Sequence, residues 1–213
     1  LYAMGDGNHS FATAKAIWEQ LKTDAADPAD VMDHPARYAL VELVNVHDPG
    51  LEFEAIHRVI FDVDTDDLLA KADDYYRQAG TPCQVEWYDD LAAANAAVKA
   101  AAGEHAVPFV AAGRDGRLKL ADPTLTLEVA TLQNFLDEYL QKVPAVRIDY
   151  IHGDEAVSRL GGQQGNLGFY LPSISKHDLF RTIVRDGALP RKTFSMGEAD
   201  EKRFYLEARK ITR

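Results

Sequence analysis

The sequence predicts a mixed α/β protein, with a mixed sheet that contains a long antiparallel hairpin, flanking helices and a smaller α/β unit. Three observations predict this class. Runs rich in β-branched and aromatic residues alternate with runs of helical period. A strong turn signal, Asp48-Pro49-Gly50, separates two of the β-rich runs. With 213 residues, of which 46% are hydrophobic, the chain is long enough to bury a core.

The expected elements follow in order along the chain. Residues 1–4 should end a buried strand, and apolar residues at helical spacing predict an amphipathic helix over 10–22. The β-rich runs on either side of 48–50 predict the long hairpin. Further helices are expected at 65–78, 89–102, 127–140 and 154–160, with strands at 84–88, 107–112, 117–122, 145–151 and 167–172. A turn is expected at Arg114-Asp115-Gly116, and a last helix should be capped by Ser175 and ended by Gly187.

This pattern predicts three segments. Residues 1–64 would hold an anion-binding loop, a helix and the hairpin, and residues 65–125 would form the smaller α/β unit. Residues 126–213 would form a β-α-β-α segment that packs back on 1–64. Because Leu1–Met4 enters the polar stretch directly, we expect the chain to be part of a longer protein, whose amino-terminal half would be its partner.

Charge and composition exclude several classes of function. The net charge of −11, from 23 basic and 34 acidic residues, would repel a phosphate backbone, so no nucleic-acid partner is expected. No apolar run approaches the roughly 20 residues that span a bilayer, so no membrane partner is expected either. The lone Cys83 cannot form an internal disulfide and is interpreted as a small apolar filler, which favours a cytoplasmic location. Zinc-ligand spacing is missing, so the residues predict no metal site. A Ser-His-Asp signature of nucleophilic catalysis is missing too.

The stretch GDGNHSFATAK, residues 5–15, is the main candidate site. Glycines before a helix let backbone N–H groups point at an anion, which the helix dipole also favours. The candidate ligand-binding residues are Gly5, Asp6, Gly7, Asn8, His9 and Ser10. The stretch lacks the Lys-Ser/Thr pair of a Walker loop, and Ser10 stands where the dinucleotide fingerprint needs its third glycine. A purely structural role in turning the chain and capping the helix stays open, and it predicts a loss of roughly 1 kcal/mol on substitution without an effect on binding.

Candidate residues elsewhere could bind the same anion. Strand alternation places His57 on one face of its strand and Arg58 on the other. His57 is either a ligand residue or a hydrogen-bonded core histidine. His152 follows a strand and is either a ligand contact or a strand-end histidine. Arg191, Lys192 and Thr193 lie in an irregular stretch, where they could supply cations to the phosphate or form a solvated basic pair.

Four ordered blocks carry a resemblance to a known family. GDGNHSFATAKAIWEQL resembles the signature of the bacterial family catalogued as domain of unknown function 1015, whose commoner form is Asp-Gly-His-His-Arg before a helix of small residues. LVNVHDPGLEFEAIHRVIF, VRIDYIHG and LFRTIVRDGALPRKTFSMGEADEKRFYLEARKI resemble the family's later blocks. The resemblance implies that this chain is the carboxy-terminal half of a longer protein.

The Asp-Gly-His-His-Arg form is in turn similar to the phosphate-binding loop of the ParB and sulfiredoxin superfamily, which includes serine kinases that use nucleotides. Asp6, Gly7 and His9 match that pattern, whereas Ser10 replaces the arginine, a bidentate phosphate partner. The resemblance implies a small-molecule phosphate ligand and, for the full-length protein, an amino-acid kinase that uses a nucleotide with magnesium. Asp6 would hold the magnesium ion, and His9 would stabilise the transferring phosphoryl group. The alternative is a non-catalytic module that senses a ligand or binds a protein.

Overall fold

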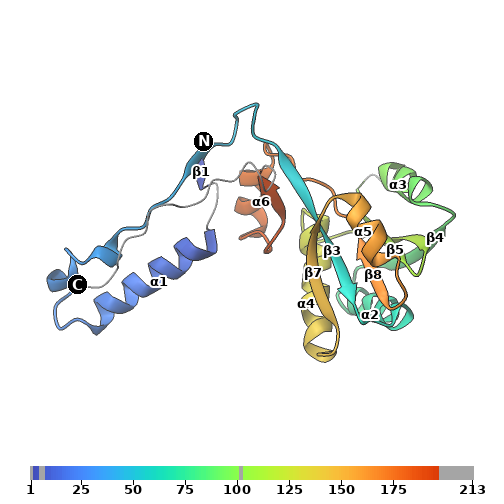
Figure 1. Ribbon diagram of the computed structural model, residues 1–213, viewed down its shortest axis with the longest axis horizontal. Coiled ribbons are helices and arrows are strands. Elements are labelled where there is room, and N and C mark those ends of the chain that lie inside the picture. Colours follow the sequence, from blue (N-terminus) through green and yellow to red (C-terminus); the bar gives the residue numbers. More distant parts are fainter. Residues whose placement is uncertain (1, 5–7, 101–102, 197–213) are drawn as a thin grey trace. The chain divides into compact units, whose positions relative to one another are not determined.

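The structure is a computed structural model that describes residues 2–4, 8–100 and 103–196 (Figure 1). The chain divides into two compact units. The first comprises Leu1–Glu52 and Met196–Arg213, and the second comprises Phe53–Ser195. These boundaries differ from those of the three segments expected from the sequence. Each unit is described by itself.

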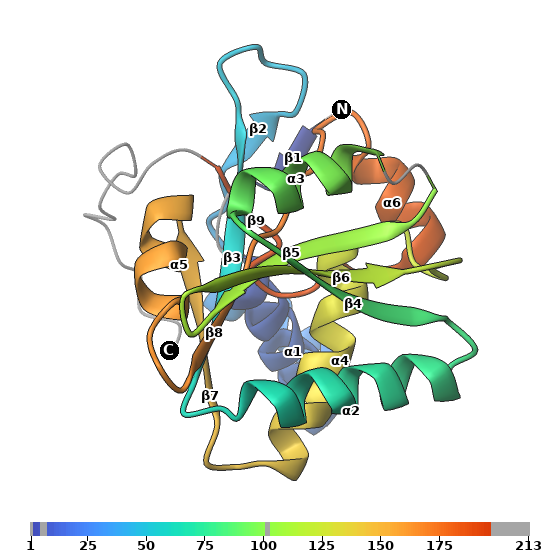
Figure 2. The ribbon, with the colours of Figure 1, turned by 90° about the vertical axis from the view of Figure 1, so that its right-hand side faces the viewer.

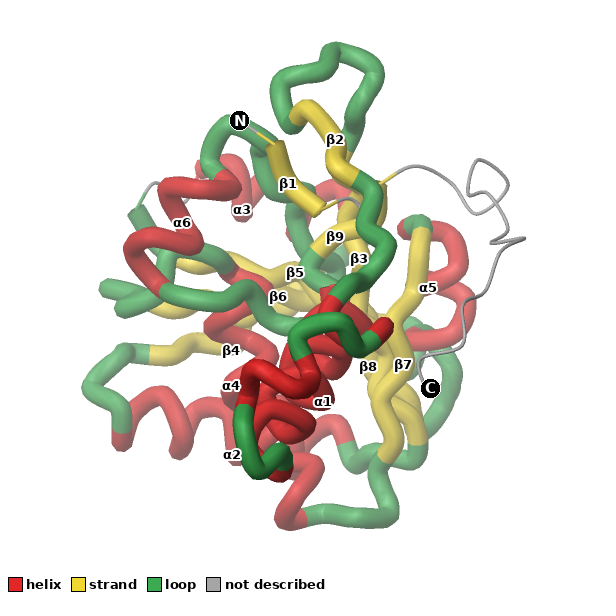
Figure 3. The backbone as a smooth tube through the Cα atoms, turned by 90° about the vertical axis from the view of Figure 1, so that its left-hand side faces the viewer, coloured by secondary structure: helices red, strands yellow, loops and turns green. Residues whose placement is uncertain are grey.

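The first unit contains the predicted opening helix. Its elements are β1 (Tyr2–Met4), α1 (Asn8–Asp24), the 3₁₀ turns η1 (Pro28–Val31) and η2 (Pro35–Arg37), and β2 (Leu43–Asn45). The helix expected over 10–22 is confirmed. β1 and β2 pair as a short antiparallel ladder in which Ala3 lies opposite Val44 (Figure 3). The apolar stripe of α1 is only partly covered, because Trp18 and Leu21 are half-buried while Phe11 is exposed.

The second unit is a seven-stranded antiparallel sheet with five helices among its described residues (Figure 2). The strand order is β4-β6-β5-β8-β3-β7, and β9 pairs with β3 off this path. The strands are β3 (Phe53–Phe61), β4 (Cys83–Tyr88), β5 (His105–Ala111), β6 (Arg114–Leu120), β7 (Arg147–His152), β8 (Asn166–Phe169) and β9 (Phe194–Met196). The helices are α2 (Thr65–Gln78), α3 (Leu91–Ala100), α4 (Glu128–Lys142), α5 (Asp154–Gly161) and α6 (Leu179–Asp186). The mixed α/β class is therefore confirmed.

Helices cover both faces of this sheet. On one face, α2 and α4 bury residues such as Leu68 and Leu136 against the large core cluster, which includes Ile60 and Phe109 from the sheet. On the other face, Val157 of α5 packs against a smaller cluster. Because alternate residues of a strand point to opposite faces, β3 serves both clusters and is buried along most of its length. This double burial holds His57 and Arg58 on opposite sides of the sheet.

The predicted long hairpin around residues 48–50 does not form. The turn itself exists, since Gly50 N–H donates to Asp48 Oδ1 over 2.8 Å and Leu51 N–H donates to the Asp48 carbonyl. However, β2 pairs with β1, whereas β3 pairs with β7 and β8. The two strands belong to different compact units, so each finds its partners far away in the sequence.

Two local expectations also need correction. The turn between β5 and β6 lies at Ala112-Gly113, both with positive φ, and not at residues 114–116, which belong to β6. Positive φ at both central residues gives the tight two-residue turn whose twist matches a hairpin. Ser175 does not cap α6, because Asp178 takes the N-cap position and Ser175 begins a preceding turn. The end of α6 at Gly187 is confirmed.

Residues 65–125, expected to form the smaller α/β unit, supply α2, α3 and β4–β6. These strands lie in the same continuous sheet as β3, β7 and β8. None of the helices in the described part of the chain is long and apolar enough to cross a membrane.

Candidate functional site

The opening loop lies largely outside the described residues. This applies to Gly5, Asp6 and Gly7. Asn8 and His9 are the first two residues of α1, and Ser10 is exposed in its first turn. α1 has 17 residues and no acidic residue in its first turn, so no carboxylate of that turn offsets the partial positive charge of its N-terminus. Such a helix end attracts anions.

The other candidate residues belong to the second unit, and two of them are joined there. Arg58 of β3 lies fully buried on the face that α4 covers. Its Nη2 donates to the Arg191 carbonyl over 3.2 Å, so the irregular stretch after α6 closes over it. Arg58, Arg191 and three residues that bind them form what we call the Arg58 cluster; the three are Gln133 and Asp137 of α4 and Tyr150 of β7.

Most of the N–H groups of the Arg58 guanidinium donate hydrogen bonds to neutral acceptors. Nε donates to Gln133 Oε1 over 2.9 Å, and Nη1 donates to the carbonyl of Ile56 over 2.7 Å. The ring of Tyr150, which lies opposite Arg58 in the β3–β7 ladder, is 4.6 Å from the guanidinium carbon. Burial lowers the pKa of Arg58 well below its ordinary value, to about 10, because a charged group is less stable away from water. With its donors held by protein atoms, Arg58 organises the buried polar contacts beneath the irregular stretch after α6.

Arg191 is the exposed member of the cluster. Its Nε donates to the Tyr150 hydroxyl over 2.5 Å, and its Nη2 pairs with Asp137 Oδ1 over 2.7 Å. The hydrogen bond to Tyr150 raises the pKa of Arg191, so this guanidinium stays charged. Its side chain is about half exposed. Arg191 therefore offers positive charge to solvent from a fixed position.

Lys192 and Thr193 continue this stretch. Lys192 is exposed, with a left-handed backbone at φ 54°, a conformation that non-glycine residues adopt infrequently. No ion-pair partner faces its ammonium group in the described residues. Thr193 is buried, and its hydroxyl donates to the Pro190 carbonyl over 2.7 Å. Thr193 thus holds the turn that presents Arg191 and Lys192.

His57 is a hydrogen-bonded core histidine on the opposite face. Leu171 N–H donates to its Nδ1 over 2.9 Å, so the ring proton lies on Nε2, which faces Asp154 Oδ1 at 2.9 Å. Desolvation lowers the pKa of His57 despite the nearby Asp154 carboxylate, and the ring is neutral at pH 7. Because both ring nitrogens are engaged, His57 has no lone pair free to accept a proton from a ligand. His152 is exposed at the end of β7, where it lies opposite Ile56.

Sequence reasoning missed Gln133, Asp137, Tyr150 and Asp154. One signal was available: the amphipathic period of α4 places position 133 on the buried face, where a glutamine requires a polar partner. The partners of Arg191 and His57 come from other elements and leave no local signal. In the described part of the chain, His, Cys, Asp and Glu side chains form no group of three or more that could hold a metal ion.

The fold is similar to that of three solved structures. A conserved hypothetical protein from Pyrococcus furiosus is 15% identical, with a TM-score of 0.58 over 91% of this chain and 69% of that chain. A mutant of a free serine kinase in complex with ADP is 14% identical, with a TM-score of 0.52 over 72% of this chain and 57% of that chain. The same kinase in complex with AMP gives 12% identity and a TM-score of 0.54 over 92% of this chain and 86% of that chain. At these identities the likeness shows the fold alone.

No curated protein matches the chain. The family described as "Protein of unknown function (DUF1015)" matches residues 1–139. This match covers more than half of the sequence and includes the opening motif and all of β3. The protein therefore belongs to this family.

Proposed function

We propose that this protein binds a phosphorylated small molecule, of the nucleotide class, at the loop Gly5–Ser10. One observation carries the proposal: the fold is similar to that of a free serine kinase solved with ADP and with AMP. The N-terminus of α1 supports it, because the first backbone N–H groups of a helix have no partner within the helix and, with the helix dipole, favour a phosphate there. His9 and the loop amides would hold the phosphate, and Asp6 would hold a magnesium ion.

As part of a longer protein, the chain would then act as a small-molecule kinase. In such a reaction a hydroxyl oxygen of an amino acid bonds to the terminal phosphorus of the nucleotide, the bond from that phosphorus to its bridging oxygen breaks, the nucleotide leaves with one phosphate fewer, and a base takes the hydroxyl proton. Ser10 favours the second candidate, a module that binds the nucleotide without turnover, because a serine cannot replace a bidentate arginine.

A thermal-shift experiment tests binding. ADP, AMP, inorganic phosphate and phosphoserine are each added, with and without magnesium, to the wild type, His9→Ala and Lys22→Ala. Lys22 is the matched control, since it lies in the last turn of the same helix. A ligand at 100 times its dissociation constant stabilises the folded state by about 2.7 kcal/mol. We expect a shift with ADP or AMP that His9→Ala removes and Lys22→Ala keeps; equal shifts in all three proteins would contradict the proposed site.

A second assay separates the two candidate functions. The protein is mixed with magnesium, free serine and either ATP or ADP, and phosphoserine and the shortened nucleotide are followed. Production of phosphoserine and of ADP from ATP, or of AMP from ADP, in equal amounts supports the kinase. Nucleotide binding without phosphoserine formation from either donor supports the sensing module.

A further inference from the structure

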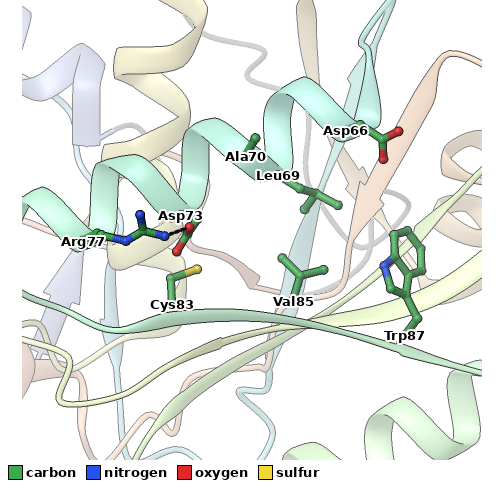
Figure 4. A pocket seen from close by; sticks show the side chains of 8 residues that line it. All are labelled: Asp66, Leu69, Ala70, Asp73, Arg77, Cys83, Val85 and Trp87. Carbon is green, nitrogen blue, oxygen red and sulfur yellow. Dashed lines mark hydrogen bonds and ion pairs between the residues drawn. The ribbon is translucent and has the colours of Figure 1, made fainter.

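A groove of about 420 Å³ lies between α2 and β4, at one edge of the sheet (Figure 4). β4 contributes Cys83, Val85 and Trp87, which alternate along the strand, and α2 contributes Asp66, Leu69 and Asp73. Asp66 and Trp87 lie toward one end, Leu69 and Val85 in the middle, and Asp73 and Cys83 toward the other end. Arg77 lines that second end too, where it pairs with Asp73, so the groove has an apolar middle, the Asp66 carboxylate at the Trp87 end and an ion pair at the Cys83 end.

β4 is the edge strand, and its hydrogen-bond pattern can be assigned from one bond. Ala121 N–H donates to the Pro82 carbonyl over 3.0 Å, so this pair bonds directly across β4 and β6. In an antiparallel ladder such pairs alternate with non-bonded pairs. Gln84, Glu86 and Tyr88 therefore bond to β6, while Cys83, Val85 and Trp87 point their backbone N–H and C=O groups outward. No described strand pairs with that side of β4.

The same three residues thus supply both a free backbone edge and the floor of the groove. Natural sheets protect such edges with a proline, a bulge or a charged side chain that points inward. The groove face of β4 carries none of these, and Trp87 is 36% exposed. An exposed edge beside a groove is the arrangement in which an extended peptide adds as a further strand, with alternate side chains entering the groove.

The negative charge of α2 favours a basic ligand in the groove. This helix carries four aspartates against two basic residues; they are Asp66, Asp67, Asp73 and Asp74 against Lys71 and Arg77. Asp73 is already paired with Arg77. The carboxylate of Asp66 has no partner in the described residues and stands at the Trp87 end of the groove. Arg114 already lies over the Trp87 ring at 4.0 Å, so the attraction for a further cation at this end of the groove comes from the Asp66 carboxylate.

We propose that β4 and α2 form a docking site for an extended basic peptide of another protein, which adds to the sheet beside β4. A lysine or arginine of this peptide would lie near Asp66, and an apolar residue two positions away would lie over Leu69 and Val85. The spacing follows from the strand period, because Val85 and Trp87 are also two positions apart. This inference is independent of the proposed nucleotide site.

A second copy of this chain is a poorer occupant. Pairing of β4 with its counterpart would place another acidic α2 beside the first. Like charges in that position repel, and the chain as a whole carries −11. Charge complementarity therefore favours a basic partner.

Hydrogen exchange with a synthetic probe tests the proposal directly. The probe is acetyl-TKTVTKT-amide, in which a lysine lies two positions from the valine in both chain directions, and acetyl-TETVTET-amide is its acidic control. The basic peptide should slow amide exchange at Cys83, Val85 and Trp87, with no change at Gln84, Glu86 and Tyr88, whose amides are already bonded to β6. The acidic peptide should protect none of them.

Three variants locate the contacts. Asp66→Lys should weaken binding of the basic peptide by about tenfold. Asp74→Lys is the matched control, because it makes the same charge change on the same helix outside the groove, and it should bind like the wild type. Val85→Pro removes one outward N–H from an edge strand, where proline is tolerated, and should abolish protection at Cys83 and Trp87.

The proposal is overturned if neither peptide protects the three amides, if both protect them equally, or if Asp74→Lys weakens binding as much as Asp66→Lys. Should Val85→Pro fail to fold, the two lysine variants decide the outcome. Protection of the same amides that grows with protein concentration, without any peptide, would instead assign this edge to a second copy of the chain and overturn the basic partner.

Discussion

Replacing Gln133 by leucine tests how the protein keeps Arg58 charged in its core. Gln133 is 2% exposed, and its Oε1 is the acceptor for Arg58 Nε. Leucine has a similar volume but accepts no hydrogen bond, so the substitution leaves a buried charged donor unpaired. Hydrogen bonds to charged groups contribute about 1.5–3 kcal/mol, and we expect Gln133→Leu to lower the free energy of unfolding by about this amount.

The pKa of Arg58 makes this prediction more specific. Because burial lowers this pKa to about 10, keeping the charge inside the folded protein costs about 3 kcal/mol relative to water. Arg58→Met removes this cost together with the hydrogen bonds, so we expect a change within about 1–2 kcal/mol. The double variant should then be more stable than Gln133→Leu alone, because no charge remains to be left unpaired.

Urea unfolding of the four proteins, followed by circular dichroism, measures these free energies. Asn134→Leu is the matched control, because it makes a comparable polar-to-leucine change at an exposed position of the same helix, and it should stay within about 0.5 kcal/mol of the wild type. The reasoning is refuted if Gln133→Leu matches this control, or if the double variant is less stable than Gln133→Leu.

Three further predictions concern other parts of the second unit. Burial lowers the pKa of His57 and His105, so below pH 6.5 the unfolded chain binds protons that the folded protein does not. The free energy of unfolding should therefore fall on acidification from pH 7 to pH 5, and it should fall less in His57→Gln. Equal falls in the wild type and in His57→Gln, measured by urea unfolding, would contradict this. Gly161→Ala should lower the free energy of unfolding by about 1–3 kcal/mol, since the added Cβ would lie 2.5 Å from the backbone nitrogen of Gly168. An unchanged thermal midpoint would show that α5 can shift away from β8. Partial burial raises the pKa of Cys83 to about 12, so its alkylation by iodoacetamide at pH 8 should be at least roughly a hundredfold slower than that of a free thiol. A rate like that of glutathione would contradict the raised pKa.

Local sequence patterns predicted the helices and strands whose formation depends on residues within the element itself. Helix α2 begins at Thr65 because Asp64 caps it, and the cap and the apolar stripe are both visible in the sequence. The alternation of β3 placed His57 and Arg58 on opposite faces, as the structure confirms. The opening helix was expected from its period and begins at Asn8, next to the candidate loop.

Patterns failed where a partner is distant in the sequence. Two β-rich runs around a good turn predict a hairpin. The stability of a strand, however, depends on the strands with which it pairs, and β3 pairs with β7 on one side and β8 on the other instead of with β2. The roles of Arg58 and Arg191 could not be separated either. Both are basic residues in plausible places, and only α4 and β7 decide that one is enclosed and the other is exposed.

The sequence by itself determined the α/β class, nearly all of the helices, the family and the candidate phosphate loop, because these follow from short-range periodicity and from motifs in consecutive residues. The tertiary structure alone decided which strands pair, how Arg58 is held, and that β4 is an open edge beside an acidic helix. The physical reason is that strand pairing and the burial of a charge depend on groups brought together from far along the chain. No local propensity encodes those contacts.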